Sequence, residues 1–255
     1  MNLKLSLRYQ LHDCKKAIII FYAIVFAVLL LMTLSISFPD SNIVTVKGRL
    51  GGMEIATAIF LFVAGLNSFR ETFRMFLQNS ISRKTMFIGR LVSVSTISLG
   101  MALIDSIIST VFKKLVPINS EVNYESIIET MYRSRYEINS SGVSMYLEKV
   151  LFSLCLYAAV SMIGYFITTL YYRTGKGAKI AVSVGVPAGL FIALPIVDAS
   201  LFHGEIGRAF GDLISFAFGY SNGANPYYGM VTLLLIFAVF SALSWLLARK
   251  AVIKD

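Results

Sequence analysis

The stretch Ala17–Pro39, AIIIFYAIVFAVLLLMTLSISFP, runs for 23 residues without a charge, between Lys16 and Asp40. A helix needs about 20 mainly apolar residues to cross the hydrocarbon core of a bilayer, so this stretch predicts a transmembrane helix. The rest of the chain has the same character, because 56% of its 255 residues are hydrophobic and only 15% are charged. Soluble domains carry about 25% charged residues. The composition therefore excludes a disordered chain, a disulfide scaffold and an ordinary soluble enzyme.

Further stretches of this kind complete a pattern of six spans. Val150–Tyr172 is uncharged, and Leu213–Ala248 is uncharged but too long for one span, so the turn residues Ser221–Pro226 divide it. Two other spans each contain one acid, Glu54 and Asp105. We predict an all-α polytopic membrane protein with a single transmembrane domain, in which the spans cover about 17–38, 50–69, 87–112, 150–172, 179–198 and 227–248.

The distribution of charge predicts the orientation of these spans. If the N-terminus lies inside, the inner segments hold 15 basic residues against 3 acids, a net charge of +12. The remaining residues then carry −3 of the total of +9. Because Lys and Arg gather in cytoplasmic loops, we predict that both termini are cytoplasmic. The basic balance thus reports topology and not nucleic-acid binding, although Lys47, Arg49, Lys113 and Lys114 fall on the outer side.

Residues 1–16 form a polar segment ahead of the first span. Leu3, Leu7 and Leu11 are spaced four apart, which is the pattern of an amphipathic helix lying on the inner leaflet. A frayed tail is the alternative interpretation. The segment lacks a cleavage-site pattern, so we expect no removable signal peptide.

The inner segment 70–86, between the second and third spans, is the most informative part of the sequence. In its first part, RETFRMFLQN (70–79), the spacing of Phe73, Phe76 and Leu77 places them on one face of a helix. We expect these side chains to be exposed and to dock on a protein partner, since exposed aromatic residues mark interaction sites. The alternative is that the apolar face lies on lipid while the cations bind anionic headgroups. The candidate docking residues are Arg70, Glu71, Phe73, Arg74, Phe76, Leu77, Arg83 and Lys84.

Two long segments are predicted on the outer side. In 113–149, charged residues recur every four positions, which predicts one charged stripe along an extracellular helix; these residues are Glu121, Glu125, Glu129, Arg133 and Glu137. We expect this helix to cover the mouth of a pathway or to contact a second subunit. In 199–226, the apolar run Leu213–Tyr220 predicts a short helix, or a helix pair, that dips back into the outer leaflet.

The sequence predicts no catalytic chemistry in this chain. The basic turn RTGKGAK (173–179) lacks the spacing of a phosphate-binding loop. His12 and His203 fall on opposite sides of the predicted membrane, and no cluster has metal-ligand spacing. Cys14 is predicted cytoplasmic and Cys155 lies within a span, so we expect no disulfide between them. We therefore expect no cofactor, no metal and no enzymatic activity on the chain itself.

Three acids lie toward the outer ends of the spans, at Glu54, Asp105 and Asp198. Intramembrane ionisable residues are functional candidates by default, so these three are candidates for the outer part of a transport pathway. The alternative is that each one sits at headgroup depth or pairs with a neighbouring Lys or Arg.

Small residues in the third and fourth spans predict close helix packing within the subunit. They are Ser93, Ser95, Ser98 and Gly100, together with Ala158, Ala159 and Gly164. In the fifth span, Gly185, Pro187, Gly189 and Pro195 predict a helix that can bend.

The stretch QNSISRKTMF (78–87) and the arrangement around it resemble the membrane subunit of a bacterial type-2 ABC exporter. Such permeases are similar in having six spans, an interfacial helix before the first, a cytoplasmic coupling helix between the second and third, and short outer helices before the last. The glycine usual before the Ile-Ser-Arg-Lys core is Ser80 here. Gram-positive permeases that export phenol-soluble modulins or confer immunity to antimicrobial peptides are the most similar in character.

This resemblance implies a transport mechanism that depends on other chains. A separate ATPase subunit, carrying ATP and Mg²⁺, is expected to push on residues 71–79 and to open a path between two permease subunits, identical or homologous. Phe73, Phe76 and Leu77 would anchor in a groove of that ATPase, while Arg70 and Arg74 pair with acids on its rim. The substrate expected to leave the cell is amphipathic or hydrophobic, such as a peptide.

Two other classes of function stay open at the sequence level. An ATPase-independent secondary transporter or channel would carry charged residues near the centres of its spans, where this chain has none. A non-transporting membrane scaffold or sensor partner would use the segment 70–90 to bind a different cytosolic protein.

Overall fold

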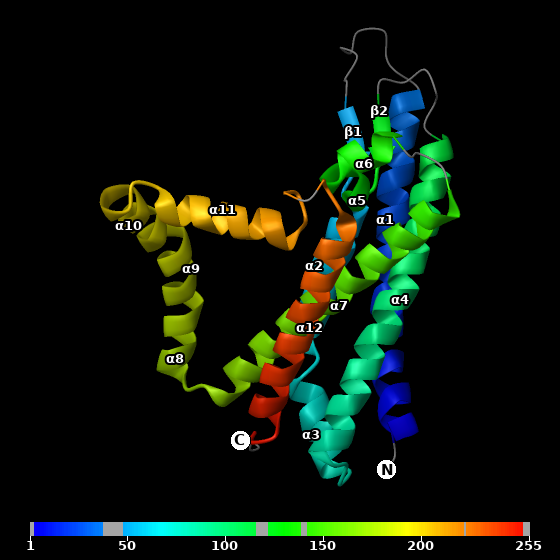
Figure 1. Ribbon diagram of the computed structural model, residues 1–255. Coiled ribbons are helices and arrows are strands. Elements are labelled where there is room, and N and C mark those ends of the chain that lie inside the picture. The colour runs from blue at the N-terminus through cyan, green and yellow to red at the C-terminus, as the bar shows by residue number, and fades with distance from the viewer. Residues whose placement is uncertain (1–2, 38–47, 116–121, 139–141, 222, 252–255) are drawn as a thin grey trace.

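The computed structural model describes residues 3–37, 48–115, 122–138, 142–221 and 223–251 (Figure 1). Within these ranges, five helices are long and apolar enough to cross a membrane, judged by length and composition. They cover Ser6–Leu34, Arg83–Lys114, Val143–Arg173, Gly177–Leu201 and Pro226–Ala248. The count becomes six if α2 (Met53–Asn67) and α3 (Arg70–Gln78), which meet at a bend of 41°, are taken as one span. The architecture thus agrees with an all-α membrane protein.

The segment predicted as the second span, about 50–69, corresponds to α2, which differs from the prediction at both ends. α2 contains 15 residues, about 22 Å of helix, which is shorter than the roughly 30 Å hydrocarbon core. It begins after Gly52, whose φ of 90° is a left-handed conformation that favours glycine. It ends where the Ser68 hydroxyl donates a hydrogen bond to the Gly65 carbonyl at 2.7 Å. The chain then turns into α3 instead of continuing.

α7 (Val143–Arg173) is the centre of the bundle. It packs against α2, α4 (Arg83–Leu115) and α12 (Pro226–Ala248), and α1 (Leu3–Ser37) packs on α4 (Figure 1). The start of α1 and the end of α12 lie at the end of the bundle where α3 is found, which we call the inner end. The opposite end is called the outer end.

A contact between two glycines sets the distance between α2 and α7. A Cβ atom added at Gly164 would lie 3.1 Å from the backbone nitrogen of Leu66 and closer still to the carbonyl of Phe62. A Cβ atom at Gly65 would likewise meet the backbone of α7 at Ser161. The prediction of tight packing is therefore confirmed at Gly164. It is wrong at Ser95 and Gly100, which are exposed on α4.

The N-terminal segment is part of the first span and not a separate helix. α1 runs without interruption from Leu3 to Ser37, about 52 Å, which is longer than the core of a bilayer. Its first turns pack on α4, because Gly89 allows Ser6 and Gln10 to approach closely. The Gln10 amide also donates a hydrogen bond to the Met86 carbonyl at 3.5 Å. The structure thus replaces the predicted leaflet-lying helix with an extension of the first span.

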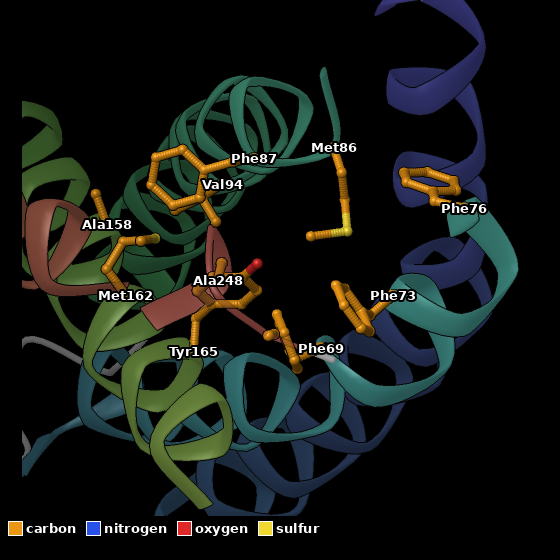
Figure 2. Packing of buried hydrophobic residues seen from close by; sticks show 11 residues of the cluster. Phe69, Phe73, Phe76, Met86, Phe87, Val94, Ala158, Met162, Tyr165 and Ala248 are labelled. Carbon is orange, nitrogen blue, oxygen red and sulfur yellow. The ribbon is translucent and has the colours of Figure 1, made fainter. Parts of the chain in front are cut away.

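Apolar side chains form separate clusters at the two ends of the bundle. The inner cluster brings together residues of α3, α4, α7 and the end of α12 (Figure 2). It consists of Phe69, Phe73, Phe76, Met86, Phe87, Val94, Ala158, Met162, Tyr165, Ala248 and Ala251. The outer cluster joins α5 (Ile127–Met131) and α6 (Arg133–Ile138) to α7 and α12, and consists of Ile128, Tyr132, Tyr136, Met145, Phe152, Cys155, Ala159, Met230 and Leu233.

The outer end is closed by a two-stranded parallel sheet that the sequence did not predict. β1 (Gly48–Gly51) pairs with β2 (Val122–Glu125), with Gly48 opposite Val122 and Gly51 opposite Glu125. The sheet joins the segment before α2 to the segment after α4. Gly51 is required there, because a Cβ atom would lie 2.6 Å from the Glu125 carbonyl oxygen.

This sheet overturns the predicted single helix with a charged stripe. Glu125 lies in β2, Glu129 in α5 and Arg133 in α6, so they share no helix face. Glu121 falls outside the described residues. The break has a local cause, because Ser126 caps α5 and its backbone NH donates a hydrogen bond to the Glu129 carboxylate at 2.8 Å. Such a capping box begins a helix and leaves Glu125 to the strand.

The fifth span stands apart from the bundle (Figure 1). It is a continuous helical segment with two π-helical turns: α8 (Lys176–Ile180), η1 (Ala181–Gly185), α9 (Val186–Ala188), η2 (Gly189–Ala193) and α10 (Leu194–Leu201). Pro187 and Pro195 lack a backbone NH, and wider turns accommodate such residues. The two π-helical turns lie next to the residues from which a helix able to bend was predicted, and the bending itself stays a prediction. α11 (Glu205–Ala217) then crosses back to the bundle, and it includes most of the run predicted to dip into the leaflet.

Candidate functional site

α3 is the candidate docking segment, and its bounds match the prediction closely. It begins at Arg70 and ends at Gln78. Its C-terminus has the hydrogen bonds of a Schellman motif: the Ile81 amide donates to the Phe76 carbonyl at 2.8 Å, and the Ser80 amide donates to the Leu77 carbonyl at 3.1 Å. Ser80 has a φ of 55°, the left-handed conformation that glycine adopts most easily. The departure from the usual glycine of the resembled permeases therefore falls at a strained position.

The apolar face of α3 points inward, which contradicts the expectation that its aromatic residues are exposed. Phe73 and Phe76 are 0% and 1% exposed. Phe73 stacks on Phe69 at 5.1 Å between ring centroids (Figure 2). It also meets the edge of Tyr172 at 5.5 Å between ring centroids. Phe76 lies 5.8 Å from the ring of Tyr9 on α1. These aromatic residues are covered by their own chain, because the ends of the neighbouring helices offer an apolar surface at the same place.

The outward face of α3 is polar. Arg70 and Glu71 are exposed, and so are Gln78 and Asn79, while Arg74 and Leu77 are half-buried. The cations that follow α3 have different surroundings. Lys84 is exposed, whereas the Arg83 guanidinium donates a hydrogen bond to the carbonyl of Arg249 at 2.7 Å. Arg83 thus ties the start of α4 to the end of α12, and a partner would meet Arg70, Glu71 and Lys84 first.

The structure brings two of the three predicted outer acids together and separates the third. Asp105 is 2% exposed, and its two carboxylate oxygens accept hydrogen bonds from Tyr22 at 2.7 Å and from Tyr157. Glu54, 5% exposed on α2, lies close enough to Asp105 for the two to interact electrostatically. The result is a buried polar cluster between α1, α2, α4 and α7.

Tyrosines, and not the Lys or Arg of the alternative interpretation, donate the hydrogen bonds to Asp105. The hydrogen bonds that described residues give to its carboxylate come from α1 and α7, 83 and 52 residues away in sequence. Thr57 on α2 lies beside the same carboxylate and is fully buried. Tyr22, Thr57 and Tyr157 were not predicted from the sequence. The feature that could have identified them is a hydroxyl group inside an otherwise apolar span.

Asp198 has a structural role. Its carboxylate accepts hydrogen bonds from the backbone NH groups of Ile206, at 2.9 Å, and Gly207, at 2.8 Å. These groups belong to the first turn of α11, where a negative charge is favoured by the helix dipole. Asp198 therefore fixes the corner between α10 and α11, separate from the cluster of the other two acids.

Buried ion pairs hold the outer end together. Glu129 accepts hydrogen bonds from Lys149 at 2.7 Å and from Lys113 at 3.1 Å, and its other oxygen binds Ser126. Burial alone would raise the pKa of Glu129, but the hydrogen bond from Lys149, the Ser126 NH and the two positive charges lower it to about 2.

A second group at the outer end surrounds Glu148. Its carboxylate accepts hydrogen bonds from Arg135 at 2.8 Å, Tyr136 at 2.7 Å and Tyr227 at 2.8 Å. Burial and the hydrogen bond to Glu148 raise the pKa of the Tyr136 hydroxyl. Arg135 and Tyr136 lie on α6, Glu148 on α7 and Tyr227 on α12. These hydrogen bonds therefore connect α6 to α7 and α12.

Within the described ranges, no group of three or more His, Cys, Asp or Glu side chains could hold a metal ion. Comparison of the chain with protein-family models, with curated proteins and with solved structures gives no match.

Proposed function

We propose that this chain is the permease subunit of an ATP-driven exporter of the bacterial cytoplasmic membrane, working with a separate ATPase subunit and a second permease copy or homologue. The observation that carries the proposal is α3. It is a short helix at the inner end that presents a polar face outward and is fixed by aromatic contacts to the ends of several spans. The cargo is an amphipathic or hydrophobic substrate, such as an antimicrobial peptide, which follows from the resemblance described above.

The contacts of α3 suggest how such a subunit couples to its ATPase. The partner, which carries ATP and Mg²⁺, binds the outward residues Arg70, Glu71 and Lys84 through complementary charges. Phe73 and Phe76 act on the inner side of the helix, because they are packed against Phe69 and Tyr172 and so connect α3 to α7. Since packed interiors transmit displacement without being compressed, a push on α3 moves α7 with it.

Charge reversal on the outward face tests this proposal. The variant Arg70→Glu with Lys84→Glu changes two exposed side chains and should reduce association with the ATPase, and the ATP hydrolysis of the complex, by tenfold or more. Lys179→Glu on α8 is the matched control at the same end of the molecule and should leave both unchanged. The measurements are co-purification from the native membrane and ATP hydrolysis in nanodiscs.

The same purification separates the alternatives. If wild-type protein copurifies with a cytosolic protein that hydrolyses no ATP, the chain is a scaffold. If it copurifies with no partner but carries substrate across a vesicle membrane, it is a secondary transporter. Either result overturns the proposal.

A further inference from the structure

A cavity of about 290 Å³ lies between α1, α2 and α4 near the inner end. Residues that line it include Gln10, Cys14 and Ile18 on α1, and Arg90, Val94 and Ile97 on α4. On the remaining side it is lined by residues of α2 and of the start of α3, namely Phe60, Leu61, Val63, Ala64, Asn67, Ser68 and Thr72. The volume is close to the lower limit of about 300 Å³ for small-molecule sites. The cavity is distinct from α3's outward face and from the Asp105 cluster.

Its lining changes from polar to apolar in the same direction on all three helices. Along α1 the order is Gln10, Cys14, Ile18, and along α4 it is Arg90, Val94, Ile97. α2 runs the other way, and its order from the inner end is Asn67, Ala64, Phe60. The polar part therefore lies at the inner end and the apolar part deeper in the bundle. A molecule with a polar head and an apolar chain has the same two parts.

The cavity opens sideways between two spans. Among its lining residues, Ala17 on α1 and Val63 and Asn67 on α2 are exposed, whereas Leu61, Val94 and Ser161 at the back are buried. Ala17 and Val63 belong to apolar helix surfaces that face lipid if these helices span a membrane. A lipid could thus enter laterally from the leaflet at the inner end.

Two polar side chains define the head that the cavity accepts. Arg90 is 5% exposed and is the only charged residue among the described residues that line the cavity. Its guanidinium has five NH donors in a fork that matches phosphate, and it lies over the ring of Tyr165 at 5.3 Å. Gln10 is 4% exposed, and its side-chain oxygen is buried without a hydrogen-bond partner. The head should therefore offer both a negative charge and a hydrogen-bond donor.

We propose that this cavity binds an anionic phospholipid with a hydroxylated head, from the leaflet at the inner end. The phosphate binds Arg90, a head hydroxyl donates to the Gln10 oxygen, and one acyl chain begins along Ile18, Phe60 and Ile97. The other chain stays in the bilayer, because the volume admits only part of the lipid. Basic pockets between transmembrane helices bind anionic headgroups for the same electrostatic reason.

Cys14 provides a direct measurement of occupancy, because it lines the cavity. The full chain is placed in nanodiscs of phosphatidylcholine alone, or with one third replaced by phosphatidylglycerol, and alkylation of Cys14 is followed by mass spectrometry. Phosphatidylglycerol should slow the alkylation about tenfold, the factor expected for one charge-assisted contact. Soluble glycerol phosphate should give no protection, because it lacks the chain. Cys155, buried in the outer cluster, reports unfolding in the same sample.

Variants separate specific binding from nonspecific effects. Arg90→Gln should abolish the difference between the two lipids, and Arg90→Lys should keep part of it. Ala64→Phe fills the cavity and should make Cys14 slow to react in both lipids, while Ala193→Phe, on the exposed η2 segment, should change nothing. Equal protection by phosphatidylcholine, or undiminished protection in Arg90→Gln with Cys155 still unreactive, would overturn the proposal. So would protection by an amphipathic peptide in place of the anionic lipid.

Discussion

The two ends of the bundle are held together by different forces. At the inner end, α3 is fixed by rings and apolar side chains, such as Phe69, Phe73 and Tyr172. At the outer end, α5 and α6 are held on α7 by ion pairs whose carboxylates, Glu129 and Glu148, are buried. Apolar packing does not respond to pH, whereas buried ion pairs depend on the ionisation of their members. A change of pH can therefore loosen the outer end while the inner end stays intact.

The largest effect is expected at the glycine contact between α2 and α7. Gly164→Leu places a side chain against the backbone of α2, so the helices must separate and both ends should lose their packing. We expect almost no monodisperse protein in size-exclusion chromatography in detergent. Gly100→Leu is the matched control, since Gly100 has open space around it, and should behave as the wild type. Comparable yields for both variants would show that the contact does not set the fold.

The next largest effect is expected from acid, which should destabilise the outer end and leave the inner end unchanged. The pKa of Glu129 is about 2 in the folded protein, below its ordinary value of 4.5, so its stabilisation is complete above about pH 4.5 and is lost as the pH falls toward 2. Between pH 6 and pH 3, hydrogen exchange corrected for its intrinsic rate should increase in residues 122–138 and stay constant in α3. In Glu129→Gln the outer end should already exchange faster at pH 6, and its dependence on pH should weaken. Equal acid sensitivity of both ends would remove the distinction.

The smallest effect concerns the inner end alone. Ser80→Gly replaces a residue with φ of 55° by one that adopts this conformation without strain, so α3 should become more stable by roughly 1 kcal/mol. Slower hydrogen exchange over residues 70–81, with unchanged exchange at the outer end, is the expected result. Asn79→Gly is the comparison, because Asn79 has an ordinary negative φ of −90° and the change should destabilise or have no effect.

Sequence patterns predicted the local elements better than their surroundings. The bounds of α3 followed from residues within nine positions of one another, but its apolar face could be assigned to a partner or to the chain itself. Only the folded bundle decides this, because Tyr9, Tyr165 and Tyr172 come from other helices. The same limit applies to Asp105, which was identified as an intramembrane acid while its two tyrosine donors were not. β2 was missed since its partner strand lies far away in the sequence.

The pairing of β1 with β2 has a consequence for biosynthesis. Gly48 and Val122 are register partners. The ribosome adds the residues between them at about 5–20 per second, so β1 has no partner strand from its own chain for several seconds. Throughout that interval α2 and α4 are made and inserted, while the strand ahead of α2 can still pair wrongly with a neighbouring chain. The outer end is therefore completed late in synthesis, after the second and third spans have emerged, and Lys113 and Lys149 can meet Glu129 only then.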